Sequence, residues 1–196
     1  MQINNEAFIT QKTFRVILQA MSHPGRVYTL SQESGVKSRE SESEGLMLIL
    51  RTLLDHEVGF CVIGKEKEYL ETTISELTGC PVKDISDADF IIVSDCESKG
   101  EILKARRGSL EYPDTGATVI YVVEFLNDMD NGKPVALLRG SGIKDYITIA
   151  VRGLGKNELS HIKEINSEFP LGIDCIFIDS ANRVMCIPRS TRIKVK

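Results

Sequence analysis

The sequence predicts an α/β protein in which a mixed sheet carries helices on both faces, a three-layer α/β/α arrangement. Two continuous apolar runs, residues 58–63 and 89–93, are typical of strands that are covered on both sides. Segments with apolar residues at helical spacing alternate with these runs, and the last quarter of the chain has the pattern of a hairpin. Alternating helices and strands followed by hairpins favour a mixed sheet.

The first half of the chain is expected to alternate between helices and strands. Apolar residues recur on one helical face over 10–22, and Pro24-Gly25 ends that pattern. Residues 41–44 have the sequence of a capping box, which predicts where the second helix opens. The elements predicted here are helices over 10–22, about 44–54 and 65–78, and strands over 26–30, 58–63 and 89–93.

The second half is expected to be richer in strands. Asn131-Gly132, inside the polar turn 128–132, is a strong signal for a hairpin between strands over 117–123 and 135–138. The basic end of the chain, from Arg192 to Lys196, is expected to be an exposed tail, which either is simply solvated or binds an acidic surface of a partner. The other elements predicted here are a short helix over 97–106, a helix over 156–167, and a closing hairpin of 173–179 and 183–187 around the turn 180–182, with 145–151 ambiguous.

Length and composition limit the classes of function. A chain of 196 residues fits one domain, taken here as 1–196, and needs no disulfide or metal to stabilise its core. The formal net charge is −4 and no basic stripe is present, which argues against binding of nucleic acid. No apolar run approaches the ~20 residues of a membrane helix, and the first ten residues lack the pattern of a signal peptide. We therefore expect a soluble cytoplasmic protein without membrane contacts.

Neither the cysteines nor the histidines have the spacing of a metal site. The five cysteines are odd in number and no two are close in sequence, so free thiols in a reducing compartment are expected. His23 lies at the end of the first predicted helix, where the helix dipole would favour a charged imidazole. The alternative is an exposed side chain beside a Pro-Gly helix stop. No metal and no cofactor are expected.

A glycine-rich loop directly after a predicted strand is the first candidate for a binding site. In Arg139-Gly140-Ser141-Gly142 the two glycines would let backbone amides converge on an anion, and Arg139 could add a bidentate contact. The loop lacks the Gly-Lys-Ser/Thr ending of a Walker loop and the third glycine of a dinucleotide site. A plain tight turn is the alternative interpretation.

The two ends of the closing hairpin are the second candidate. Asp174 opens an apolar strand, where a carboxylate is unfavourable unless it is paired or hydrogen bonded. Arg189, followed by Ser190 and Thr191, leaves the facing strand, so pairing of the two strands would bring Arg189 near Asp174. This cluster could bind an anion or a partner, or only stabilise itself.

Four stretches of the sequence carry a resemblance to a known family. They are FRVILQAMSHPGRV (14–27), LRGSGI (138–143), FPLGIDCIFID (169–179) and RVMCIPRSTRIKV (183–195). These stretches resemble PhnH, a subunit of the bacterial carbon–phosphorus lyase machinery that degrades phosphonates. The similarity runs in order along almost the whole chain, and the first and last blocks are its most specific parts.

The resemblance implies a fold, partners and a process. The fold of the family is similar to the large domain of pyridoxal-phosphate-dependent transferases, without the cofactor or its lysine. PhnH-like proteins form homodimers and join the G, I and J subunits in a core complex. That transferase machinery joins a phosphonate to the ribose of a nucleoside triphosphate, giving ribose 1-alkylphosphonate 5-triphosphate with release of adenine, before the J subunit cleaves the carbon–phosphorus bond.

Two classes of function stay open for the chain itself. As an assembly subunit, which is the preferred interpretation, it should expose an apolar patch with a polar rim. As an independent anion- or nucleotide-binding protein, or an enzyme, it should bring Arg139–Gly142, Asp174 and Arg189–Thr191 to one concave site. In the second case Arg189→Ala and Arg139→Ala should weaken the activity of the complex and leave the fold intact.

Overall fold

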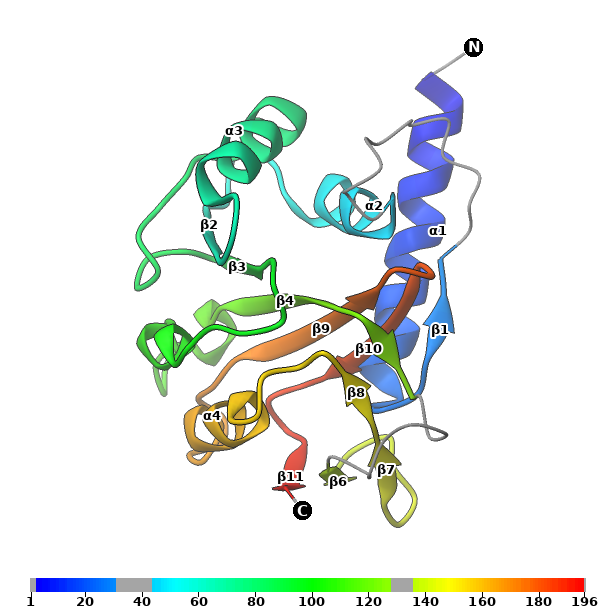
Figure 1. Cartoon of the computed structure of the whole chain (residues 1–196), viewed down its shortest axis with the longest axis vertical. Coiled ribbons are helices and arrows are strands. Elements are labelled where there is room, and N and C mark those ends of the chain that lie inside the picture. Colours follow the sequence, from blue (N-terminus) through cyan, green and yellow to red (C-terminus); the bar gives the residue numbers. More distant parts are fainter. Residues whose placement is uncertain (1–2, 31–43, 128–135, 196) are drawn as a thin grey trace.

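The fold is described by a computed structural model that places residues 3–30, 44–127 and 136–195. Its centre is a six-stranded sheet made of β1 (Tyr28–Thr29), β2 (Phe60–Ile63), β3 (Phe90–Val93), β4 (Thr118–Val123), β9 (Asp174–Asp179) and β10 (Arg183–Ile187). The strand order is β1-β10-β9-β4-β3-β2 (Figure 1). β2, β3, β4 and β9 run parallel, whereas β10 and β1 pair antiparallel at one edge. The predicted α/β class with a mixed sheet is therefore confirmed.

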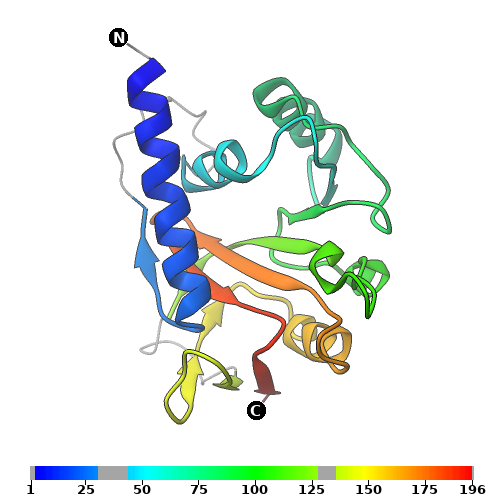
Figure 2. The same cartoon turned by 180° about the vertical axis from the view of Figure 1, so that it is seen from behind.

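Apolar side chains cover both faces of this sheet. Neighbouring residues of a strand point to opposite sides, so Ile91 and Val93 join one buried cluster and Ile92 joins the other. This double burial explains why the strands appear in the sequence as continuous apolar runs. One face is covered by α1 (Ile3–Ser22), α2 (Glu44–Leu53) and α3 (Lys67–Thr78), and the other by α4 (Glu158–Ile165) and the short 3-10 helix η1 (Glu101–Lys104) (Figures 1 and 2).

A second, three-stranded sheet lies beside α4 at one end of the molecule (Figure 1). It consists of β6 (Ala136–Arg139), β7 (Ile147–Ile149) and β11 (Arg192–Val195), and β6 pairs antiparallel with both neighbours. Its inward side chains, Leu138 and Ile193 among them, join the apolar cluster beneath α4. The strands β5 (Phe125–Leu126) and β8 (Val151–Arg152) form a separate antiparallel pair.

Two predictions for this part of the chain are wrong. The Asn131-Gly132 signal predicted a hairpin between the strands on either side of it, but β6 pairs with β7 and β11. β4 cannot accept β6 because β3 and β9 already occupy both of its edges. The turn 128–132 itself lies outside the described residues. Arg192–Val195, expected to belong to an exposed tail, form the edge strand β11.

Several element boundaries also differ from the predicted ones. α1 begins at Ile3 rather than near residue 10, because Ile9 continues the face that packs on the core. Most of the predicted helix 97–106 is not helical, since Lys99 and Gly100 have positive φ angles and only η1 forms after them. The ambiguous segment 145–151 supplies β7 and the first residue of β8. Residues 41–43 of the capping box lie outside the described residues, and α2 begins at Glu44.

The end of α1 is fixed to both sheets at Gly25. Its φ of +79° lies in the left-handed region, and its amide donates a hydrogen bond to the Cys186 carbonyl oxygen at 3.1 Å. A Cβ atom at this position would lie 2.8 Å from Cγ2 of Ile147 in β7. Glycine alone satisfies both the backbone conformation and the close packing.

We expect Gly25→Ala to lower the free energy of unfolding by about 2–4 kcal/mol, because it combines an unfavourable φ with a steric clash. Gly79→Ala is the matched control. Gly79 has a similar φ of +73°, but nothing lies within 4 Å of the position of its Cβ, so backbone strain of about 1 kcal/mol is expected alone. Urea unfolding of both variants measures the difference, and equal losses would contradict the packing role of Gly25.

Candidate functional site

Asp174 and Arg189 form an ion pair across the open end of the β9–β10 hairpin. Asp174 is the first residue of β9, and the register that sets Cys175 opposite Ile187 brings Arg189 beside it. Asp174 Oδ2 lies 2.6 Å from Nη2 and 3.1 Å from Nε of Arg189. Asp174 Oδ1 accepts a hydrogen bond from the Arg189 amide at 2.8 Å. The predicted hairpin placed Asp174 and Arg189 close together, and this proximity is confirmed.

Two of the three remaining N–H donors of the Arg189 guanidinium are also occupied. Nη1 donates to the carbonyl oxygen of Pro113, in the short 3-10 helix η2 (Pro113–Thr115), and Nη2 donates to that of Gly116 at 3.3 Å. The guanidinium therefore joins the β9–β10 hairpin to the loop that precedes β4. Arg189 has little hydrogen-bonding capacity left for a ligand, so its first role is to hold these segments together.

The glycine loop after β6 packs against both of the other segments that the sequence singled out. A Cβ on Gly142 would lie 2.1 Å from the Ser22 carbonyl oxygen, and one on Gly140 would lie 3.1 Å from the Ser190 carbonyl oxygen. Arg139 is exposed, and its Nε donates to a backbone carbonyl of the following loop at 3.2 Å. The two glycines thus permit a close approach of backbones, which accounts for them without any ligand.

A cavity of about 720 Å³ opens between these segments and α4. Four of the predicted candidates line it, namely Ser141, Arg189, Ser190 and Thr191. Asp174 is held against Arg189 and is not part of the lining. Ser141 is the one residue of Arg139–Gly142 that lines the cavity; Arg139, Gly140 and Gly142 do not.

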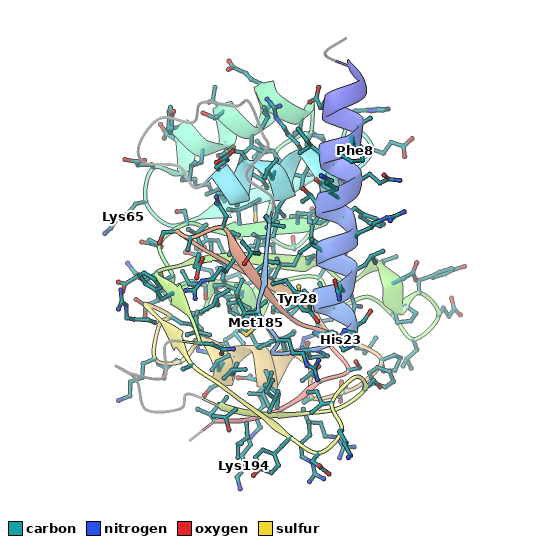
Figure 3. All side chains as sticks on the ribbon, turned by 90° about the vertical axis from the view of Figure 1, so that its right-hand side faces the viewer. Phe8, His23, Tyr28, Lys65, Met185 and Lys194 are labelled. Carbon is teal, nitrogen blue, oxygen red and sulfur yellow. The ribbon has the colours of Figure 1, made fainter. Side chains whose placement is uncertain are left out.

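His23 takes no part in this cavity. It lies at the end of α1, where its Nδ1 is 3.1 Å from the Gln19 carbonyl oxygen (Figure 3). α1 ends at Ser22, just before Pro24 and Gly25, as the Pro-Gly interpretation expected, but the His23 side chain is half-buried rather than exposed. His23 therefore lies beside the end of α1 and does not line the cavity.

Several cavity residues were not predicted as site residues. The amide of Asn166 fixes the start of β9, because it accepts a hydrogen bond from Ile173 N at 2.8 Å and donates one to Ile173 O at 3.0 Å. Phe169 is 68% exposed, and the FPLG motif was a usable sequence signal for it. Nothing in the sequence marked the helix face that carries Lys163. The residues missed are Lys163, Asn166, Ser167, Phe169, Arg192 and Ile193.

A second hollow, of about 690 Å³, is lined by residues of α3 and of the segment 82–87 together with Arg106, and its cations are already neutralised. Lys67 Nζ lies 3.6 Å from Glu71, and Asp89 pairs with both Lys83 and Arg106. Burial acts to raise the pKa of Asp89, but the Gly59 amide and the Arg106 guanidinium outweigh it and hold that pKa below its ordinary value. These internal pairs leave little net charge with which to attract a ligand.

A buried polar cluster lies under α4. The carboxylate of Glu158, 1% exposed, accepts hydrogen bonds from the Tyr121 hydroxyl at 2.7 Å and from the Ser98 amide at 3.0 Å and hydroxyl at 2.8 Å. Burial, followed by the effect of Cys175 and Glu158, raises the pKa of Tyr121 well above its usual range. The cluster is closed to solvent and fixes the loop after β3, so we assign it a structural role.

Residues 2–194 match the family described as "Bacterial phosphonate metabolism protein (PhnH)". The chain belongs to the PhnH family. It is 30% identical over 188 residues to the "Putative C-P lyase subunit protein HtxG" of Stutzerimonas stutzeri, covering 95% of this chain and 86% of that protein. It is 29% identical over 189 residues to the "Alpha-D-ribose 1-methylphosphonate 5-triphosphate synthase subunit PhnH" of Rhizobium meliloti (strain 1021), covering 95% and 91%.

In this member of the PhnH family all five cysteines are free thiols. Four are buried and Cys96 is half-buried. Burial raises the pKa of Cys61 to about 12 and that of Cys80 to about 11, and it also raises the pKa of Cys96. Within the described residues no three His, Cys, Asp or Glu side chains gather as a metal site. None of the helices in those same residues has the length and apolar character to cross a membrane.

We expect Arg189→Ala to lower the free energy of unfolding by about 2–4 kcal/mol, because it leaves Asp174 unpaired and two carbonyl groups without donors. Arg139→Ala is the control and should cost less than about 0.5 kcal/mol, since Arg139 is exposed. The structure thus replaces the expectation that both variants leave the fold intact. Chemical denaturation measures both, and a parent-like Arg189 variant would refute the structural role of the pair.

We expect Cys96 to be the only thiol that a disulfide reagent modifies in the folded protein, and to react slowly. The thiolate is the reacting form, so a raised pKa lowers its population, and the rate should still be rising with pH above about pH 8.5. Cys96→Ser should abolish the reaction, while the other four thiols react only after denaturation. Fast modification of a second thiol under native conditions would contradict the burial described above.

Proposed function

We propose that the chain is a subunit of the carbon–phosphorus lyase core complex and contributes mainly to its assembly. The family match over residues 2–194 supports this, together with two relatives whose names describe subunits of a C-P lyase and of a ribose 1-methylphosphonate 5-triphosphate synthase. The process served is the catabolism of phosphonates, by transferase machinery that acts on a nucleoside triphosphate and a phosphonate.

The outer face of α1, defined by Phe14 and Leu18, supports the assembly role. These side chains are one helical turn apart and are 46% and 49% exposed. Gln11 and Arg15, also exposed, flank them on the helix surface. An apolar pair with a polar rim is typical of a surface that a partner covers. We assign this face to contact with another subunit of the complex.

The proposal also includes the partners of the chain, its cellular compartment and the likeness of its fold. The partners are the G, I and J subunits and a second copy of the chain, and the complex works in the cytoplasm. Two apolar clusters that share one sheet support a single domain over 1–196. Four parallel strands with an antiparallel edge support a likeness to the large domain of pyridoxal-phosphate-dependent transferases.

A second function, the binding of a small anion, is favoured by the cavity between α4 and the glycine loop. Its lining combines Lys163, Arg189 and Arg192 with four hydroxyl-bearing residues. A subunit of a complex can also carry part of a ligand site, so the two functions are compatible.

Co-expression of the tagged chain with the G, I and J subunits of the same organism should give stoichiometric recovery of the complex. The double variant Phe14→Ser and Leu18→Ser should lose most of this recovery, because the partner would lose its apolar contact, while the melting temperature changes little. Phe8→Ser is the matched control. Phe8 is 50% exposed on another side of α1, with Lys12 Nζ 4.3 Å from the centre of its ring.

Each outcome separates one part of the proposal from another. A parent chain that is purified alone, without G, I or J, would refute the subunit role. Full recovery with the double variant would keep that role and reject the outer face of α1 as the contact. Equal losses of recovery with Phe8→Ser and with the double variant would show that removing any exposed apolar side chain from α1 weakens assembly. That result would also reject the outer face of α1 as the specific contact.

A further inference from the structure

We propose that the cavity beside α4 binds the phosphoryl or phosphonyl group of a small ligand through Lys163, Arg192 and the hydroxyl groups around them. The hydroxyl groups are those of Ser141, Ser190 and Thr191. This inference rests on the anion-binding part of the proposed function. It assigns the ligand contacts to cations that have no partner among the described residues, and it makes Arg189 a positioning residue.

The first observation is that the positive charges of Lys163 and Arg192 have no negative partner among the described residues. The side chains of Lys163 and Arg192 make no hydrogen bond or ion pair with any described residue, and none of the described residues that line the cavity is acidic. In the second hollow, by contrast, Lys67, Lys83 and Arg106 each face a carboxylate. The whole chain carries a formal charge of −4, so the protein as a whole is not basic.

The second observation is a pair of like charges on facing strands. The β6–β11 register sets Arg139 directly opposite Arg192, and both side chains are exposed on the same side of the small sheet. Like charges at directly opposed positions destabilise a sheet. An anion bound at Arg192 would offset this repulsion, which gives Arg139 an indirect electrostatic part in the site although it does not line the cavity.

The third observation is a buried hydroxyl group that has no hydrogen-bond partner among the described residues. Thr191 lines the cavity and is 4% exposed, and its Oγ1 has no hydrogen-bond partner among the described residues. A buried polar group is unfavourable unless it is hydrogen bonded. An anionic oxygen of a ligand would accept this hydrogen bond and remove the cost.

The walls of the cavity are held in place before any ligand arrives. Arg189 is fixed by Asp174, and Asn166 is fixed by both backbone atoms of Ile173. A volume of about 720 Å³ matches pockets for small organic ligands. The exposed ring of Phe169 at the rim offers a flat apolar surface on which a nucleobase could stack.

The test is calorimetric titration of the full chain with tripolyphosphate, methylphosphonate and ATP at low ionic strength. We expect at least one of these anions to bind. Lys163→Gln and Arg192→Gln should each raise the dissociation constant about tenfold, as expected for loss of a charge-assisted hydrogen bond, and Thr191→Val should raise it severalfold. Lys194→Gln is the control, because Lys194 is an exposed cation of the same strand that points away from the molecule outside the cavity (Figure 3).

The comparison of probes identifies the source of the anion. Tighter binding of ATP than of tripolyphosphate, lost in Phe169→Ala, would identify a nucleotide, whereas preference for methylphosphonate would identify the phosphonate. Absence of binding by all three probes would overturn the inference, and so would equal weakening by Lys194→Gln and Lys163→Gln. Because the chain is titrated alone, this result is independent of whether the G, I and J subunits are recovered with it.

Discussion

The ion pair between Asp174 and Arg189 is the interaction on which the arrangement of the site depends. Asp174 opens a buried strand, where an unpaired carboxylate would be costly, and Arg189 pairs with it through two nitrogens and the backbone amide. The same guanidinium binds the carbonyl groups of Pro113 and Gly116. The pair therefore fixes the segment that leads into β11, and with it the strand that completes the small sheet and one wall of the cavity.

The glycines in the distinctive stretches of the sequence serve mainly to allow distant segments of the chain to pack closely. Gly142 admits the Ser22 carbonyl, Gly140 admits the Ser190 carbonyl, and Gly25 admits the side chain of Ile147. These contacts join three segments that are far apart in the chain. Of the two charges proposed to bind a ligand, Arg192 lies in the last of the distinctive stretches, whereas Lys163 lies on a helix face that no motif marks.

The sequence predicted what depends on local pattern and failed where distant segments choose partners. Continuous apolar runs gave the central strands, and local antiparallel pairing placed Asp174 beside Arg189. The Asn131-Gly132 signal was misleading because β6 finds its partner in β11, more than fifty residues later. Lys163 could not be predicted for the same reason, since its place in the cavity depends on how α4 packs against β11.

The position of the cavity separates it from the usual ligand site of an open α/β sheet. Such sites lie outside the carboxyl ends of the parallel strands. Here the carboxyl end of β9 is closed, because buried Asp179 pairs with Arg183 at 2.7 Å and accepts a hydrogen bond from the Leu126 amide at 3.1 Å. The cavity lies at the amino end of β9, with walls from α4 and β11 rather than from the parallel strands. A likeness of the central sheet to that of any enzyme therefore carries no information about this site, whose chemistry must be argued from its own residues.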